Sequence, residues 1–194
     1  MEVYLIRHGI AAERETYAND EERPLTDKGR KKTKKVAKQL RKHGLHFDLI
    51  LSSPLVRARE TATILQDVGL SAHAEEFTNL APDGDIHAWV SWLEERWENG
   101  TSNKSLALVG HQPDLGNWAE RLVCGTTQEK FVLKKAGVIG LNLPEAKMPI
   151  GQSELFLLTS PKWLLWGGEL GIGKIVVLDK VLSRTARYST IKET

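Results

Sequence analysis

The chain of 194 residues lacks the features that mark secreted and membrane-spanning proteins. A single cysteine, Cys124, excludes a disulfide within the chain and favours a reducing compartment, so we expect a cytoplasmic protein. No basic segment followed by an apolar one opens the chain, and no signal peptide is expected. No apolar run approaches the roughly 18 residues that span a bilayer, and we expect no membrane partner.

An excess of charge of one sign is also missing. The 27 basic and 25 acidic residues leave a formal net charge of +2, which is too small to predict a nucleic-acid partner. Internal repeats and low-complexity segments are absent. Hydrophobic residues make up 41% of the chain, which is enough for the core of one ordinary domain. We expect that domain over residues 1–165, followed by a C-terminal extension over 166–194 without an assigned role.

Strand-like and helix-like segments alternate along the predicted domain. Buried or edge strands are expected at 3–6, 48–51, 72–77, 106–109, 138–143 and 154–158. Helices are expected between Thr26 and Gly44, between Ser53 and Gly69, from Ile86 to Glu98 and from Pro113 to Leu122. This alternation predicts an α/β fold, a three-layer sandwich with a central, mostly parallel sheet flanked by helices on both faces.

The start of the second helix has a particular consequence for Arg57. Ser53 is a good N-cap, and Pro54 suits the first helical position. Arg57 would then lie in the first turn of a helix that begins where a strand ends. Its side chain and the free backbone N–H groups of that turn would face the same ligand. The alternative is that Arg57 is exposed to solvent, in which case Arg59 of the same turn becomes the candidate for the pocket.

Three of the buried strands end in side chains that bind anions or react with them. The first ends in Arg7, His8 and Gly9. The second leads to Arg57, and the third to His111. An arginine binds a phosphate or carboxylate with two parallel hydrogen bonds, and a histidine serves as nucleophile or base near neutral pH. Gly9 would let the backbone approach a ligand closely. If the strands are neighbours, these residues form one phosphate pocket at the carboxyl edge of the sheet.

A metal or nucleotide site is not predicted. The remaining histidines, His43, His46, His73 and His87, lack ligand spacing with suitable partners. The stretch from Gly168 to Ile175 nearly matches a phosphate-binding P-loop, but Ile175 stands where a serine or threonine should hold magnesium. We therefore expect neither a metal nor another cofactor.

The first helix carries an unusual number of cations on its outer face. They are Lys28, Arg30, Lys31, Lys32, Lys34, Lys35, Lys38, Arg41 and Lys42. A solvated face is the main interpretation of such a run, and a surface for an acidic partner is the alternative.

The motifs as a set resemble those of a known family. Arg7-His8-Gly9, Ser53-Pro54-Leu55-Val56-Arg57-Ala58 and Gly110-His111 are similar, in order and spacing, to signatures of the histidine phosphatase superfamily, also called phosphoglycerate mutase-like. Pro24-Leu25-Thr26-Asp27-Lys28-Gly29 resembles the helix start of that family. The resemblance covers residues 1 to about 160. It is strongest to the small SixA-type phosphohistidine phosphatases, through the compact length, the Ala81–Asp85 loop and Gly110-His111-Gln112-Pro113.

The resemblance implies an enzyme without a metal. A phosphohistidine intermediate would form on His8, while Arg7, Arg57 and His111 hold the phosphoryl group. The implied substrate is a phosphorylated protein of the histidine phosphotransfer type. A small-molecule phosphomonoesterase with the same residues is the alternative, and a catalytically silent phosphate-binding adaptor is a third interpretation.

One departure from the family concerns the proton donor. Larger members carry a glutamate after the third strand that protonates the leaving oxygen, whereas the matching Leu80-Ala81-Pro82 has none. Asp83 and Asp85 are the nearby candidates for an acid, and each is equally suited to cap the next helix. An imidazole leaving group needs less help than an alkoxide, so the missing glutamate favours phosphohistidine as substrate.

Overall fold

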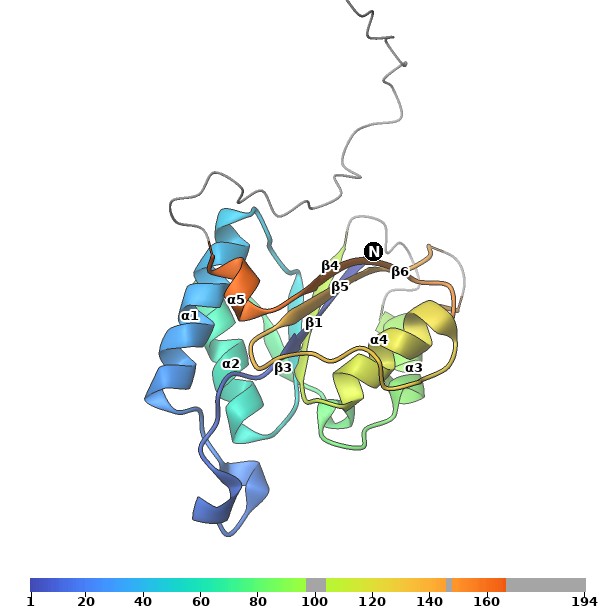
Figure 1. The fold of residues 1–194 in the computed structure, drawn as a ribbon. Helices are drawn as coiled ribbons and strands as arrows, with labels where there is room; N and C mark the ends of the chain where they lie inside the picture. The colour runs from blue at the N-terminus through green and yellow to red at the C-terminus, as the bar shows by residue number, and fades with distance from the viewer. Residues whose placement is uncertain (97–103, 146–147, 167–194) are drawn as a thin grey trace, which may run out of the picture.

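A computed structural model describes residues 1–96, 104–145 and 148–166, and six strands form one sheet in it (Figure 1). The strands are β1 (Glu2–Arg7), β2 (Leu49–Ser52), β3 (Ala74–Glu76), β4 (Ser105–Gly110), β5 (Val138–Asn142) and β6 (Glu154–Thr159). Their order across the sheet is β3-β2-β4-β1-β5-β6. The first four pair in parallel, whereas β5 is antiparallel to both β1 and β6. The mostly parallel sheet is confirmed, with the last two strands toward one edge.

Helices cover both faces of this sheet, so the predicted three-layer sandwich is confirmed (Figure 1). They are α1 (Asp27–Lys42), α2 (Val56–Asp67), α3 (Ile86–Arg96), α4 (Asp114–Cys124) and α5 (Pro161–Leu164). Residues of α1, α2 and α5 share one apolar core with the sheet, and those of α3 and α4 share the other. Short 3₁₀ turns are η1 (Arg14–Thr16), η2 (Asp20–Glu22) and η3 (Thr78–Leu80). Within the described ranges, every helix is too short or too polar to span a bilayer.

Strand β1 shows why the buried strands are continuous apolar runs. Val3 and Leu5 belong to the core under α3 and α4, while Tyr4 and Ile6 belong to the core under α1 and α2. Because both faces of the strand are buried, every residue of its interior is apolar. Trp89 of α3 lies wholly in the core, with its ring 6.0 Å from that of Trp118, as predicted for a packing role.

Helix α1 begins and packs as its sequence predicts. The Thr26 hydroxyl accepts a hydrogen bond from the backbone N–H of Gly29 at 3.0 Å and caps the helix. The expected inner stripe is buried, namely Gly29, Thr33, Val36 and Leu40. Gly29 is a contact point, because a Cβ added there would lie 2.0 Å from the carbonyl oxygen of Ile10. The helix therefore rests directly on the backbone that follows the His8 loop.

The predicted start of α2 is wrong by a few residues. The helix begins at Val56 after Leu55, rather than at Pro54 after an N-cap Ser53. The backbone of Leu55 is extended, and the Ser53 side chain is engaged with His111 instead of capping the helix. Arg57 still lies in the first helical turn, as expected. The later helix α4 likewise begins one residue after Pro113.

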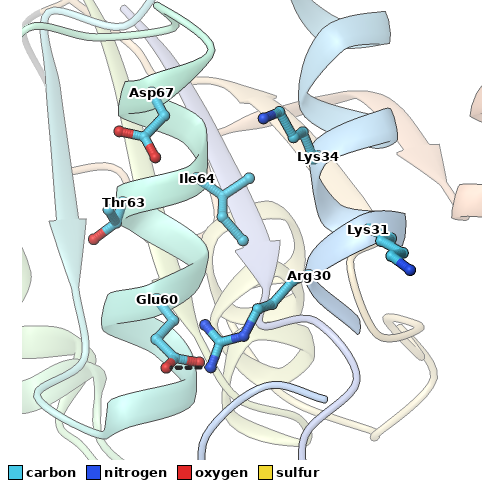
Figure 2. Close-up of a pocket in the computed structure, with 7 residues that line it drawn as sticks. All are labelled: Arg30, Lys31, Lys34, Glu60, Thr63, Ile64 and Asp67. Atoms are coloured by element: carbon cyan, nitrogen blue, oxygen red, sulfur yellow. Dashed lines mark hydrogen bonds and ion pairs between the residues drawn. The ribbon is translucent and has the colours of Figure 1, made fainter. Parts of the chain in front are cut away.

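The cations of α1 divide into two kinds. Figure 2 shows Arg30 reaching across a hollow of about 400 Å³ to Glu60 of α2, with 2.7 Å between Nη2 and Oε1, while Lys31 points away from α2. Arg41 donates to the carbonyl of Val68. Among the described residues, by contrast, no lysine of α1 pairs with a carboxylate. Both arginines thus hold the fold together, and the lysines form the solvated face.

Some sequence-based expectations lie outside the described residues. They are the end of the third helix beyond Arg96, the P-loop-like stretch from Gly168 to Ile175, and the C-terminal extension from residue 167 onward. The boundary between residues 165 and 166 stays a prediction.

The contact at Gly29 makes the fold testable. Gly29→Ala should lower the free energy of unfolding by about 1–3 kcal/mol, because the new methyl group has to displace the Ile10 carbonyl. Urea unfolding measures this change. Lys38→Ala, at an exposed position of the same helix, is the control and should stay within about 0.5 kcal/mol of the wild type. Equal stability of the two variants would contradict the packing described.

Candidate active site

The register of the sheet brings the three predicted strand ends together. In the parallel pair β1–β4, Arg7 lies opposite Gly110, and the backbone N–H of His8 donates to the Gly110 carbonyl at 3.0 Å. β2 flanks β4 on its other side. Arg7, His8, Arg57 and His111 consequently line one pocket of about 260 Å³ at the carboxyl edge of the sheet. The predicted convergence of these four residues is therefore found in the structure.

His8 is held as a neutral imidazole with a defined tautomer. Its side chain is buried, and Nδ1 lies 2.7 Å from the carbonyl oxygen of Gly9. A carbonyl only accepts hydrogen bonds, so Nδ1 carries the proton and the lone pair of Nε2 stays available. Burial, and then the neighbouring His111, lower the pKa of His8 to about 2. The imidazole is therefore uncharged at neutral pH.

Gly9 has a packing role that the sequence did not predict. It does not belong to the pocket lining, and its backbone N–H donates to the Thr61 hydroxyl at 3.1 Å. A Cβ added to Gly9 would lie 2.3 Å from the Thr33 hydroxyl oxygen, so only glycine fits between the loop and α1. The expectation that its backbone approaches a ligand stays a prediction. Gly9 packs the loop and orients His8 through its carbonyl.

His111 lies against His8, with 5.1 Å between the ring centroids. Its Nε2 is 2.8 Å from the Ser53 hydroxyl, and because the oxygen of that hydroxyl accepts from the N–H of Leu55, its O–H is left to donate to Nε2. The buried Nδ1 has no hydrogen-bond partner within the described part of the chain. Burial, followed by the positive charge of Arg57, lowers the pKa of His111 to about 3. Two neutral imidazoles thus face one pocket.

Of the two predicted arginines at the pocket, Arg57 is buried and Arg7 is half-buried, and both are partly bound by protein groups. Arg7 donates from Nη1 to the Leu133 carbonyl at 2.8 Å. Arg57 donates to the Asp20 carbonyl at 2.6 Å and to its carboxylate at 2.8 Å. Burial lowers the pKa of each arginine. The alternative candidate, Arg59, is exposed and pairs with Glu76, so it does not belong to the site.

The site contains further charged residues that were not predicted. Arg23 and Lys135 line the pocket and add positive charge to it. Asp20 pairs with Arg57 and also with Arg23, whose Nη2 lies 2.7 Å from Oδ1. Burial opposes the ionisation of Asp20, but Arg57, Arg23 and Arg14 together outweigh burial and lower its pKa. The segment around η2 lacks hydrophobic periodicity, and only the Asp-x-x-Arg spacing signalled a local ion pair.

The two predicted acid candidates, Asp83 and Asp85, lie in different places relative to the pocket. Asp85 accepts a hydrogen bond from the N–H of His87 at 2.9 Å at the start of α3, and it lies outside the pocket lining. Asp83 lines the pocket and donates its backbone N–H to Oδ1 of Asp114 at 3.2 Å. Asp114 was not predicted, yet it lines the same pocket. Burial raises the pKa of Asp114, and the hydrogen bonds that its carboxylate accepts from the backbone of Asp83 and of Asp114 itself offset only part of this rise.

Among the described residues, no three His, Cys, Asp or Glu side chains gather as metal ligands would. The expectation of chemistry without a metal stays a prediction.

The lowered histidine pKa values predict how stability depends on pH. Between about pH 7 and pH 5 the unfolded imidazoles, with pKa near 6.5, take up protons that native His8 and His111 do not. Native stability should therefore fall with acidification, by at most about 1.4 kcal/mol per pH unit for each imidazole. Urea midpoints at several pH values measure this slope. The His8→Gln/His111→Gln double variant should show a shallower slope, and an unchanged slope would contradict the assignment.

Comparison with known proteins agrees with this geometry. The sequence pattern of the histidine phosphatase superfamily (branch 1) matches residues 3–79. An uncharacterized protein of Picosynechococcus sp. is 55% identical over 166 residues, covering 85% of this chain and 99% of the relative. Phosphohistidine phosphatase SixA of Escherichia coli is 30% identical over 146 residues, covering 73% of this chain and 86% of the relative.

Solved structures show the same relationship. SixA complexed with tungstate superposes with a TM-score of 0.72 at 26% identity, over 83% of this chain and 97% of the other. A putative alpha-ribazole-5′-P phosphatase of E. coli shares the fold, with a TM-score of 0.62 at 20% identity over 83% and 98% of the two chains. On its strand-end residues, its fold and its relatives, this chain belongs to the histidine phosphatase superfamily and is a SixA-type phosphatase.

Proposed function

We propose that the chain hydrolyses phosphohistidine on a protein through a covalent phosphohistidine intermediate on His8. The observation that carries this proposal is the state of His8. Its Nδ1–H is bound to Gly9, its Nε2 lone pair is free, and the low pKa keeps the ring neutral beside two arginines. A neutral imidazole is a competent nucleophile, and the surrounding positive charge binds and polarises a phosphoryl group.

In the first step, Nε2 of His8 attacks phosphorus and a P–N bond forms. The bond to the leaving imidazole breaks, and that imidazole takes a proton from solvent. Arg7 and Arg57 neutralise the phosphoryl oxygens, and the unpartnered Nδ1 of His111 donates a hydrogen bond to one of them. In the second step, water attacks phosphorus, the P–N bond to His8 breaks, and inorganic phosphate leaves with the imidazole restored.

Asp20 adds a feature to phosphate binding. Its carboxylate already accepts from Arg57 and Arg23, which leaves less positive charge for the substrate than a bare pair of arginines would provide. The Nε of Arg57 is buried without a protein partner in the described ranges. We assign that N–H to the phosphoryl group, while the outer nitrogens of the guanidinium stay with Asp20.

A small-molecule phosphomonoesterase is the second candidate, and Asp114 is the observation that favours it. An alkoxide leaves poorly without a positioned acid, and such an acid is worth about 10²–10⁴-fold in rate. Asp114 lines the pocket and its raised pKa keeps it protonated to higher pH. The pocket thus contains a carboxyl group that could take the place of the family's missing glutamate.

The partner of this site is best described by charge. The unpaired lysines of α1 support an acidic phosphoprotein as substrate, because opposite charges steer encounter between proteins. The single cysteine supports a reducing compartment, and we assign the protein to the cytoplasm.

The nucleophile is tested by trapping the intermediate. We expect His8→Ala to abolish turnover and rapid quenching to find acid-labile, base-stable phosphate on the wild type alone. The assay contains a chelator, because the proposed chemistry uses no metal. Label on His111 would reverse the two histidine roles. Strict dependence on a divalent metal would contradict the mechanism.

The leaving group is tested by the order of kcat/KM. We expect phosphohistidine to be the best substrate, then aryl phosphates, whose leaving groups are stable anions, and then alkyl phosphates. Asp114→Asn and Asp83→Asn should leave phosphohistidine turnover nearly unchanged, as should the control Asp85→Asn outside the pocket. If Asp114→Asn instead lowers every activity about 10²-fold or more, Asp114 is a general acid and the esterase is the better assignment.

A further inference from the structure

Glu120 of α4 is a buried carboxylate that the proposed reaction does not use. Glu120 as a whole is 3% exposed. The carboxylate accepts three backbone hydrogen bonds, from the N–H groups of Gln128, Lys130 and Phe131, the last at 2.6 Å. Burial opposes its ionisation, but these N–H donors lower its pKa, so the group is charged at neutral pH. The segment that follows α4 is thereby folded around one side chain.

That segment, the 125–137 loop between α4 and β5, holds Arg7 at three points. The Leu133 carbonyl accepts from Nη1 of Arg7 at 2.8 Å. The Gly137 carbonyl accepts from the backbone N–H of Arg7 at 3.2 Å, and the N–H of Ala136 donates to the Arg7 carbonyl at 3.1 Å. The loop thus sets both the backbone and the guanidinium of this arginine.

Two further contacts connect the loop to the elements behind the pocket. Gln112, next to His111, donates to the Phe131 carbonyl and accepts from the N–H of Leu133, both at 3.2 Å. A Cβ added to Gly116 of α4 would lie 2.0 Å from the Phe131 carbonyl oxygen. The stretch from Phe131 to Leu133 therefore packs against α4 with no room to shift toward it.

We infer that Glu120 is a positioning residue for phosphate binding, which acts through the 125–137 loop on Arg7. The inference rests on the phosphate-binding role proposed above for Arg7. A loop without regular structure has to be fixed by specific bonds if it is to orient a guanidinium. The Glu120 carboxylate supplies three such bonds within a few residues of Leu133.

The direct test replaces the charge and keeps the size. In Glu120→Gln one of the two acceptor oxygens is replaced by an NH₂ group, which cannot accept from a backbone N–H, so the loop should shift and Arg7 should lose its acceptor. The Kd of inorganic phosphate, from ³¹P line broadening, should rise about tenfold or more, up to about a hundredfold. Val123→Ala, on the same helix but away from the loop bonds, controls for a general loss of stability and should leave the Kd unchanged.

A double-mutant cycle separates positioning from structure. In the Arg7→Ala background, Glu120→Gln should change the phosphate Kd by less than about twofold, because the residue through which it acts is gone. An additive loss in that background would overturn the inference while leaving the role of Arg7 intact. If Arg7→Ala alone leaves the phosphate Kd unchanged, the proposed function of the pocket is wrong instead.

A second variant covers the case in which Glu120→Gln does not fold. Gly116→Ala pushes on the Phe131 carbonyl from the α4 side and leaves the carboxylate in place. It should raise the phosphate Kd in the wild-type background and not in the Arg7→Ala background. A folded Gly116→Ala protein with unchanged phosphate affinity would show that the loop does not position Arg7.

Discussion

The parallel pairing of β1 with β4 is the constraint on which the rest of the site depends. This pairing places Arg7 opposite Gly110 and joins His8 to Gly110 by a backbone hydrogen bond. A shift of the register by one residue would turn Arg7 toward the other face of the sheet. The two apolar cores prevent that shift. Successive residues of β1 are buried on opposite faces of the sheet, one face under α3 and α4 and the other under α1 and α2. The precision of the catalytic edge is thus a consequence of core packing.

Electrostatics determines the protonation state of the side chains that the sheet brings together. Two imidazoles within 5.1 Å of one another would repel if both were charged, and the arginines around them increase that cost. Burial and positive surroundings keep both rings neutral, which is the state that the proposed nucleophile His8 requires. Asp20 moderates the same positive charge from outside the sheet. The pocket can therefore be strongly cationic and still contain a reactive histidine.

Much of this arrangement follows from local sequence, and the residues whose roles the sequence did not predict have specific reasons for it. Arg7, His8 and His111 follow apolar strands directly, so the topology of an α/β sheet places them at one edge. Ser53 was expected to cap α2, but its hydroxyl is bonded to His111, 58 positions away. From the sequence pattern, Asp114 and Glu120 are ordinary polar positions on an amphipathic helix. Only the folded loop and the pocket wall give them partners.

By itself the sequence determined the layers of the fold, the strands with their reactive ends, and the family to which they point. Hydrophobic periodicity and capping residues are local properties, and they suffice for those conclusions. Tertiary structure alone decided the tautomer of His8, the packing role of Gly9, the pairing of Asp20 with Arg57 and the anchoring of the loop by Glu120. Each of these depends on hydrogen-bond geometry or burial between segments brought together by folding, which no local pattern encodes.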